Sequence, residues 1–221
     1  MDTRCDKRSL YLRDHTHCNL FSQPRGLLKI CLKNSDCTSI SLLTTNGLFI
    51  GRFQPFHKGH LVTVKFALGR VDQLVIVVGS AQKSHEPRNP FTAGERIRMI
   101  KESLDADEEV DVRRILIIPV PDIDVHSLWA HQVGMLVPKY DIVFTNDLFT
   151  LMLFHEQGIK AIEAPLYRRE EMRATEIRKR MVIEENWEDL VPKPVSKVIK
   201  EINGVERVKA ISRRDIPGHI I

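Results

Sequence analysis

"GRFQPFHKGH", residues 51–60, follows the short apolar run GLFI and places His57 and His60 on either side of Gly59. The apolar run is typical of a buried strand, and the residues after it are typical of a helix. The first turn of a helix has free N–H groups that carry partial positive charge and favour a bound anion. The stretch therefore predicts a strand-to-helix turn that holds a phosphate.

The same change from a short apolar run to a longer amphipathic segment recurs along the chain. Strands are expected at 47–51, 73–79, 115–120, 141–145 and 160–164, and helices between them at 58–70, 92–104, 126–137 and 147–157. Continuous β-branched or Leu-rich runs are typical of strands buried on both faces. Strand–helix–strand repetition predicts an α/β fold with right-handed crossovers and a doubly wound parallel sheet. A mainly helical C-terminal part follows over 175–202.

Composition restricts the class of protein. Residues 1–45 carry seven Lys/Arg and four Asp/Glu, a net charge of +3. The whole chain has a net charge of +4, so the body, 46–221, has a net charge of +1 and is close to neutral. We therefore expect no nucleic-acid footprint on the body. No apolar run approaches the roughly 20 residues that cross a bilayer, so we expect no membrane partner. All four cysteines lie within the first 37 residues, which fits a cytoplasmic protein that folds without disulfides.

Residues 1–45 differ from the body. They show no clear helical or strand periodicity over 5–26, and early charges exclude a signal peptide. The cluster of His15, His17 and Cys18 could bind zinc with the other cysteines, but no C-x-x-C pair is present and the irregular spacings favour a segment without a metal. We expect a poorly ordered extension that contributes nothing to activity, followed by one catalytic domain over 46–221.

The residues of the opening stretch suit a phosphate site. Gly51 permits an unusual backbone angle where the strand ends, and Gly59 leaves room for a ligand backbone. His57 and His60 share one face of the turn, and each becomes a cation when a phosphate raises its pKa. Arg52 adds a planar fork for phosphate oxygens. A structural helix start with two exposed histidines is the alternative, but the position after a buried strand favours the phosphate site.

Three separated segments resemble one known family. They are GLFIGRFQPFHKGHL (47–61), VVGSAQKSHEPRNPFTAGERIRMI (77–100) and ATEIRKRM (174–181). They are similar to the archaeal type of nicotinamide-nucleotide adenylyltransferase, in the H-x-G-H nucleotidyltransferase superfamily, over about residues 46–208. The resemblance implies a Rossmann-like nucleotidyltransferase fold. It also implies adenylyl transfer from ATP, with Mg²⁺, to nicotinamide mononucleotide, giving NAD and pyrophosphate, in a homo-oligomer that is a hexamer in the family.

The resemblance also assigns roles to residues. It implies catalytic roles for His57, His60, Arg52 and Arg178. It implies ATP or phosphate contacts for Gly51, Phe53, Gln54, Gly59, Thr175 and Arg88. Contacts to the nicotinamide nucleotide fall to Gly79, Ser80, Asn89, Asp122 and Trp129. No side chain is expected to bind a metal.

Some of these assignments have structural alternatives. Arg88 could reach a phosphate and Asn89 a base or ribose, or the loop could simply turn the chain into the next helix. Trp129 could stack on the nicotinamide ring or belong to the core, since it shares a helical face with Val133 and Leu136. His126 stands where related sequences often carry Asn, which affects the expected contacts to the pyridine.

A second anion site is expected near residue 175. Thr175 suits a helix N-cap and places Arg178 at the third helical position, next to the β- and γ-phosphates. The family has a small hydroxyl or glycine run before this threonine, and here it reads Met172-Arg173-Ala174. The charged run YRREEMR before it is otherwise typical of an exposed loop.

Other functions fit parts of the sequence. A pantetheine-phosphate adenylyltransferase or a cytidylyltransferase would share the H-x-G-H turn, but the SAQ…NPFTAGER block and Trp129 favour the nicotinamide branch. A non-catalytic nucleotide-binding module, or a nucleic-acid-binding protein that uses 1–45, belongs to another class. The intact histidine pair and Arg178 favour the enzyme.

Overall fold

The computed structural model describes residues 27–31, 37–41, 44–165 and 172–214. The chain divides into two compact units, residues 1–43 and 44–221. The second unit contains every site residue that the sequence predicts. Its assignment as one catalytic domain stays a prediction.

The first unit contains a pair of strands that the sequence analysis does not anticipate. Strands β1 (Leu27–Cys31) and β2 (Cys37–Ser41) pair antiparallel, with Leu27 opposite Ser41. The two runs contain isoleucine and threonine, which favour extended backbone. Strands therefore form here although apolar and polar residues do not alternate clearly. The cluster of His15, His17 and Cys18 lies outside the described residues.

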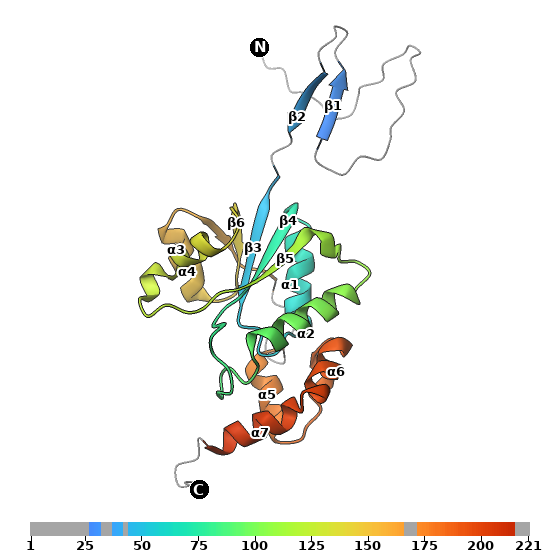
Figure 1. Ribbon diagram of the computed structural model, residues 1–221, viewed down its shortest axis with the longest axis vertical. Helices are drawn as coiled ribbons and strands as arrows, with labels where there is room; N and C mark the ends of the chain where they lie inside the picture. The colour runs from blue at the N-terminus through green and yellow to red at the C-terminus, as the bar shows by residue number, and fades with distance from the viewer. Residues whose placement is uncertain (1–26, 32–36, 42–43, 166–171, 215–221) are drawn as a thin grey trace. The chain divides into compact units, whose positions relative to one another are not determined.

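The second unit is built on a parallel sheet of five strands in the order β5-β4-β3-β6-β7 (Figure 1). The strands are β3 (Asn46–Gly51), β4 (Gln73–Val78), β5 (Ile115–Pro119), β6 (Ile142–Phe144) and β7 (Lys160–Ile162). All five predicted strands are present, and every pairing is parallel. The doubly wound α/β fold is therefore confirmed.

Helices cover both faces of the sheet. They are α1 (Lys58–Leu68), α2 (Ala93–Asp105), α3 (Trp129–Leu136), α4 (Leu148–Glu156), α5 (Ala174–Val182), α6 (Lys193–Glu201) and α7 (Gly204–Arg214). Short 3-10 helices lie at η1 (Val112–Arg114), η2 (His126–Leu128) and η3 (Glu188–Leu190). Figure 1 shows α1 and α2 on one side of the sheet and α3 and α4 on the other. The C-terminal part is helical as expected, but α7 extends it beyond residue 202.

Successive side chains of a strand point to opposite faces of the sheet and pack in two separate cores. In β3, Leu48 and Ile50 join the core under α3 and α4, and Phe49 joins the core under α1 and α2. In β4, Val75 and Val77 belong to the core under α3 and α4. Leu74, Ile76 and Val78 belong to the core under α1 and α2. A strand with apolar side chains on both faces is stable only between two helical layers.

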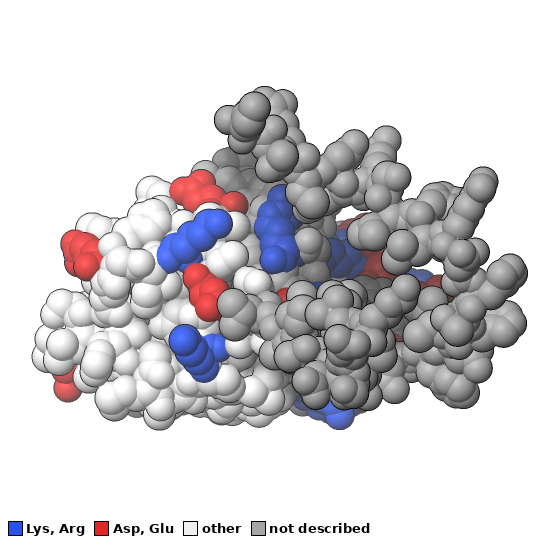
Figure 2. Space-filling view, turned by 90° about the horizontal axis from the view of Figure 1, so that it is seen from above, with Lys and Arg blue, Asp and Glu red and all other residues white. Residues whose placement is uncertain are grey.

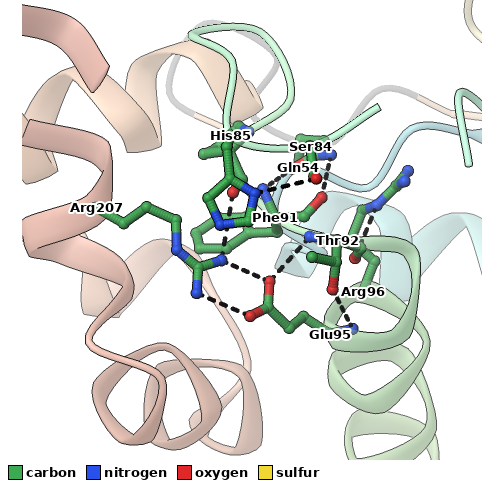
Figure 3. A network of polar contacts seen from close by, with 9 residues as sticks. Gln54, Ser84, His85, Phe91, Thr92, Glu95, Arg96 and Arg207 are labelled. Carbon is green, nitrogen blue, oxygen red and sulfur yellow. Dashed lines mark hydrogen bonds and ion pairs between the residues drawn. The ribbon is translucent and has the colours of Figure 1, made fainter. Parts of the chain in front are cut away.

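The start of α2 joins the sheet domain to the C-terminal helices. Thr92 Oγ1 accepts a hydrogen bond from the Glu95 N–H at 3.2 Å, and Glu95 Oε2 accepts one from the Thr92 N–H at 2.9 Å. These two bonds form a capping box. Figure 3 shows Arg207 of α7 reaching toward Glu95, with nitrogen–oxygen distances of 2.7 and 2.9 Å. This half-buried pair holds α7 against the loop that precedes α2.

The end of β3 differs from expectation in its backbone. The left-handed conformation falls on Phe53, with φ 52°, and not on Gly51. A Cβ added at Gly51 would lie 2.8 Å from Cζ of the Phe53 ring. Gly51 is therefore needed for the space that this buried ring occupies, and the expectation of an unusual angle at Gly51 was wrong.

The face of the molecule seen in Figure 2 carries mixed charge among its described residues. On the face shown in Figure 2, blue basic and red acidic side chains lie interspersed among uncharged residues. This mixture agrees with the near-neutral composition of the body. Within the described ranges, no helix combines the length and apolar character that a membrane crossing requires.

Replacing Gly51 by alanine should destabilise the fold. The added Cβ must displace the Phe53 ring, so we expect Gly51→Ala to lower the free energy of unfolding by about 1–3 kcal/mol. Urea unfolding followed by circular dichroism measures the change. Gly94→Ala is the matched control, because a Cβ there meets nothing within 4 Å. In helix α2 that alanine should be neutral or stabilising by up to about 1 kcal/mol, and equal effects of the two variants would contradict the packing argument.

Candidate active site

The carboxyl ends of β3 and β6 form the topological switch point of the sheet. The helix that follows β3 packs on one face, and the helix that follows β6 packs on the other, so the two connections separate and leave a crevice. A cavity of about 390 Å³, the central cavity, lies there. It is lined by residues of 49–63, by Arg88, by 145–147 and by 172–178.

His57 and His60 form a reciprocal cap at the start of α1. The His57 N–H donates to Nδ1 of His60 at 3.2 Å, and the His60 N–H donates to Nδ1 of His57 at 3.3 Å. The two rings stack with centroids 3.5 Å apart. They therefore share one face of the turn, as their spacing predicts, and both line the central cavity. His57 is 7% exposed, which contradicts the alternative of two exposed histidines.

This cap fixes the tautomer of both rings. A ring nitrogen that accepts a hydrogen bond carries no proton, so the neutral form of each imidazole is protonated on Nε2. The strand-to-helix turn is predicted to hold an anion with the free backbone N–H groups of the first helical turn. The N–H of His60 is instead taken by His57, and the histidines offer Nε2–H donors in its place.

Burial keeps the pair uncharged. It lowers the pKa of His57 to about 3, and burial followed by the charge of His57 holds the pKa of His60 well below its usual range. Without a ligand both rings are therefore neutral at neutral pH. The expectation that they become cations depends on a bound phosphate and stays a prediction.

Positive charge at the central cavity comes from arginines. Arg52, Arg88 and Arg178 reach it from the end of β3, the loop before α2 and α5. Burial lowers the pKa of Arg178 to about 10, and the charges of Arg52 and Arg88 contribute to this shift. The pKa of Arg52 is lowered by burial and then by Arg88. Guanidinium groups carry a positive charge at neutral pH, and the repulsion among several of them makes the cavity suitable for a polyanion.

The expected helix start at Thr175 was wrong. Helix α5 begins at Ala174, with Arg173 as the N-cap residue, so Thr175 is the second helical residue and Arg178 the fifth. Arg173 has the extended backbone of an N-cap residue, so the helix cap lies two residues earlier than the threonine pattern predicts. Thr175 and Arg178 still line the central cavity. Residues 167–171 of the charged run lie outside the described residues.

Gln54 and Gly59 shape the central cavity. The Gln54 amide donates to Phe91 O and accepts from the Phe91 N–H, both at 2.9 Å, which ties residues 51–57 to the loop before α2 (Figure 3). The Gln54 carbonyl accepts from Nη1 of Arg178 at 2.8 Å. A Cβ at Gly59 would lie 3.1 Å from the His57 ring, so this glycine makes room for the imidazole.

Phe53 belongs mainly to the core. It is 1% exposed, and its ring lies edge-on to His60 with centroids 4.8 Å apart. It also touches the wall of the central cavity. Its predicted contact to ATP, like those of Gln54 and Gly59, stays a prediction.

A second cavity of about 430 Å³ adjoins the first and shares Arg52 and Arg88 with it. Four of the five residues predicted to contact the nicotinamide nucleotide line this second cavity, namely Gly79, Ser80, Asp122 and Trp129. Gly51, which was predicted to contact ATP, also lines it. The Trp129 ring meets Phe154 of the core edge-on with centroids 6.3 Å apart. Trp129 is therefore both a partner of the core and a wall of this cavity.

Asp122 and Asn89 lie at a third hollow of about 520 Å³, beside Arg52, Ser80 and Arg88. Asp122 accepts a hydrogen bond from Ser80 Oγ at 3.1 Å and pairs with Lys83 at 3.2 Å. Asn89 is 5% exposed and closes a tight turn with Glu86 through backbone bonds of 2.9 and 3.2 Å. The structural role of this loop is thus present. Ligand contacts by Asn89 and Asp122 stay predictions.

The site also contains residues that sequence reasoning missed. Thr145, Asn146 and Asp147 follow β6 and line the central cavity. Their position after a buried strand is the same signal that identified residues 51–60, and it could have found them. Arg96 supports the ends of β3 and β4 from within α2, and no sequence signal marks it as buried.

The described walls of the central cavity include one carboxylate, that of Asp147. Over the described ranges, no group of three or more His, Cys, Asp or Glu side chains could hold a metal ion. A divalent ion at this site would take its ligands chiefly from phosphate oxygens and water, as Mg²⁺ commonly does.

Sequence comparison relates the chain to characterised proteins. The family model described as Cytidylyltransferase-like matches residues 48–180. A nicotinamide-nucleotide adenylyltransferase of Pyrococcus furiosus is 46% identical over 166 residues, which are 75% of this chain and 88% of the relative. The enzyme of the same name from Saccharolobus solfataricus is 47% identical over 77% of this chain and 99% of the relative.

Solved structures share the fold. A bifunctional NMN adenylyltransferase/ADP ribose pyrophosphatase from Francisella tularensis, complexed with AMP and a manganese ion, superposes with a TM-score of 0.66 at 24% identity. The match covers 78% of this chain and 54% of that one. A Plasmodium falciparum nicotinic acid mononucleotide adenylyltransferase complexed with APC gives a TM-score of 0.53 at 11% identity, over 74% of this chain and 98% of that one. At these identities the likeness concerns the fold alone.

Acidification should destabilise the protein through the histidine pair. Because the folded-state pKa of His57 lies below its unfolded value, the unfolded chain binds more protons, and stability is complete above about pH 6.5 and falls toward pH 3. We expect a loss of about 2 kcal/mol per such histidine between pH 7 and pH 5. Urea unfolding at several pH values measures it.

Matched variants separate this effect from other titrations. His57→Asn keeps an N-cap acceptor and should flatten the pH dependence between pH 5 and 7 by the share of one histidine. His131→Asn, on the exposed side of α3, controls for the loss of one imidazole. A wild-type slope in the His57 variant would contradict the buried neutral ring.

Proposed function

The chain belongs to the nicotinamide-nucleotide adenylyltransferases, and we propose that it transfers the adenylyl group of ATP to nicotinamide mononucleotide, giving NAD and pyrophosphate. The relatives that carry this name cover most of the chain at 46–47% identity. The reaction makes the protein an enzyme of NAD biosynthesis.

One observation carries the proposal. Four arginines and two neutral imidazoles line one cavity at the switch point of the sheet, those of Arg52, Arg88, Arg173, Arg178, His57 and His60. Among the cavity's described walls, Asp147 supplies the only carboxylate. Such a site attracts a triphosphate and a phosphate monoester together, because both need their charge neutralised before they can approach.

The chemistry needs alignment more than proton transfer. An oxygen of the mononucleotide phosphate attacks the α-phosphorus of ATP in line, and the bond from that phosphorus to the bridging oxygen of pyrophosphate breaks. The attacking phosphate is already ionised near neutral pH, so no general base is required. Catalysis then consists of holding two polyanions together and stabilising the charge that moves onto the leaving oxygens.

The histidines and arginines divide this work. His57 and His60 donate Nε2–H hydrogen bonds to the phosphate oxygens at the reacting centre, in a geometry that their mutual cap fixes in advance. Arg52 and Arg178 neutralise the triphosphate, and Arg88 bridges the two substrate cavities, since it lines both. A divalent ion such as Mg²⁺ would be held mainly by the phosphate oxygens of ATP and would neutralise part of their charge.

The second cavity suits the mononucleotide. The nicotinamide ring of this substrate is a cation, and Trp129 and Phe149 supply aromatic surface there. Asp122 and Asp147 add negative charge to the same cavity. Positive charge from Arg52 and Arg88 at the boundary with the central cavity suits the phosphate end of the same molecule.

Oligomeric state and location stay predictions. The family resemblance favours a homo-oligomer, a hexamer, and the exposed apolar side chains of α3 and α4 support burial in such an assembly. Met135 is 70% exposed and Leu148 is 68% exposed. A cytoplasmic location is expected from the composition of the chain.

A panel of acceptors tests the reaction. Purified protein is incubated with ATP, Mg²⁺ and, separately, nicotinamide mononucleotide, its deamidated form and phosphopantetheine, and the products are separated by chromatography. We expect NAD from the first acceptor and no dephospho-coenzyme A from the third. Exclusive use of phosphopantetheine would assign the protein to the other branch of the superfamily, and no product from any acceptor would favour a binding module.

Removing one imidazole should impair turnover far more than folding. His60→Ala deletes one Nε2–H donor, and we expect kcat to fall on the order of 100-fold or more. The loss in the free energy of unfolding should stay within about 2 kcal/mol, since His57 Nδ1 still accepts a hydrogen bond from the backbone N–H of the alanine at position 60. His131→Ala, at an exposed position that lines none of the three cavities, serves as the control. Turnover near the wild-type value in His60→Ala would remove this histidine from the mechanism.

A further inference from the structure

Arg96 is a fully buried cation that bonds to the protein backbone. It lies in the first turns of α2 and is 0% exposed. Its guanidinium donates from Nη1 to Arg52 O at 2.8 Å and to Gly79 O at 2.7 Å, and from Nη2 to Ser80 O at 3.0 Å. Its Nε donates to Thr92 O at 3.2 Å, beside the capping box seen in Figure 3.

No carboxylate neutralises this guanidinium directly. Within 44–165 and 172–214, no Asp or Glu oxygen is found at ion-pair distance from Arg96. A buried charge without an ion partner is costly, so its hydrogen bonds to carbonyl oxygens must compensate. Burial lowers the pKa of Arg96 to about 10, and the group therefore stays charged at neutral pH.

The acceptors of Arg96 are the ends of two neighbouring strands. β3 ends at Gly51 and β4 at Val78, and the carbonyls of Arg52, Gly79 and Ser80 follow directly. Without a donor these carbonyl oxygens would present partial negative charge beside a cavity for polyanions. The guanidinium cancels that charge and joins the two strand ends through one rigid fork.

Both connected segments lie in the proposed active site. Arg52 lines all three cavities, and Ser80 lines the second and third. Ser80 has a φ of 49°, in the left-handed region that serine rarely adopts. Its carbonyl is held by Arg96 and its hydroxyl by Asp122. Arg96 itself is absent from the walls of these cavities, so it touches no substrate there.

We propose that Arg96 is a positioning residue for adenylyl transfer, which fixes Arg52 and Ser80 at the ends of β3 and β4 so that the Arg52 side chain meets the reacting phosphates. This inference rests on the proposed function. Arg96 lies outside the cavity walls and acts on the site through its hydrogen bonds to backbone carbonyls. A lysine in its place keeps the charge, but the three N–H groups on its single nitrogen cannot bond all four carbonyl oxygens that the three guanidinium nitrogens hold.

The test is a double-mutant cycle between Arg96→Lys and Arg52→Ala. In the otherwise wild-type protein, Arg96→Lys should lower kcat about 100-fold while KM for either substrate changes much less, because misplaced groups act mainly in the transition state. In the Arg52→Ala background the same change should cost only a few-fold, since the group that it positions is gone. Turnover is measured with whichever acceptor of the panel the wild-type protein uses. A wrong acceptor thus overturns the proposed function and leaves this test intact.

Controls separate positioning from general stability. Arg98→Lys changes an exposed arginine of the same helix, bound to Glu102 and Glu201, and should leave kcat unchanged. All assays are run where urea unfolding shows the variant to be folded. If Arg96→Lys does not fold, Arg96→Gln, which keeps two donors, replaces it in the cycle. A wild-type kcat in the folded variant, or equal costs in both backgrounds, would overturn the inference.

Discussion

Two backbone N–H groups at the start of α1 decide what the histidines of the site can do. Each is bound to Nδ1 of the other imidazole, at 3.2 and 3.3 Å. The bonds complete the helix cap and, at the same time, leave Nε2 as the hydrogen-bearing nitrogen of each ring. These two backbone N–H groups are thus occupied within the cap, and the imidazoles provide two side-chain donors in their place. Burial keeps both rings neutral, so the histidines supply direction and the arginines supply charge.

The arginines depend on backbone carbonyls in a comparable way. Arg178 donates to Gln54 O at 2.8 Å, and Arg96 donates to three carbonyls at the ends of β3 and β4. A carbonyl oxygen offsets part of the cost of burying a guanidinium and leaves its net positive charge in place. A carboxylate would cancel that charge. This choice of partner produces a cavity that is positive before any ligand enters it, which is the electrostatic preorganisation that phosphoryl transfer requires.

The C-terminal helices are part of the same arrangement. Arg207 on α7 pairs with Glu95, and Glu95 completes the capping box with Thr92 at the start of α2. The neighbouring Phe91 is paired with Gln54, whose carbonyl accepts from Arg178 of α5. A continuous series of polar contacts therefore connects α7 with the turn that carries the histidines. These helices help to define the site as well as extending the core.

The sequence by itself determined the layered fold and most of the central cavity. Apolar runs of strand length, separated by amphipathic segments, permit few arrangements other than a parallel sheet covered on both faces. The residues after the first strand then necessarily lie at its carboxyl edge. The tertiary structure alone decided what depends on contacts between distant segments. Examples are the burial of Arg96 under two strand ends, the space for Phe53 at Gly51, and the wall that residues 145–147 add. Local spacing records which residues lie in one turn, but burial, charge compensation and side-chain clearance are set by segments that meet only when the chain has folded.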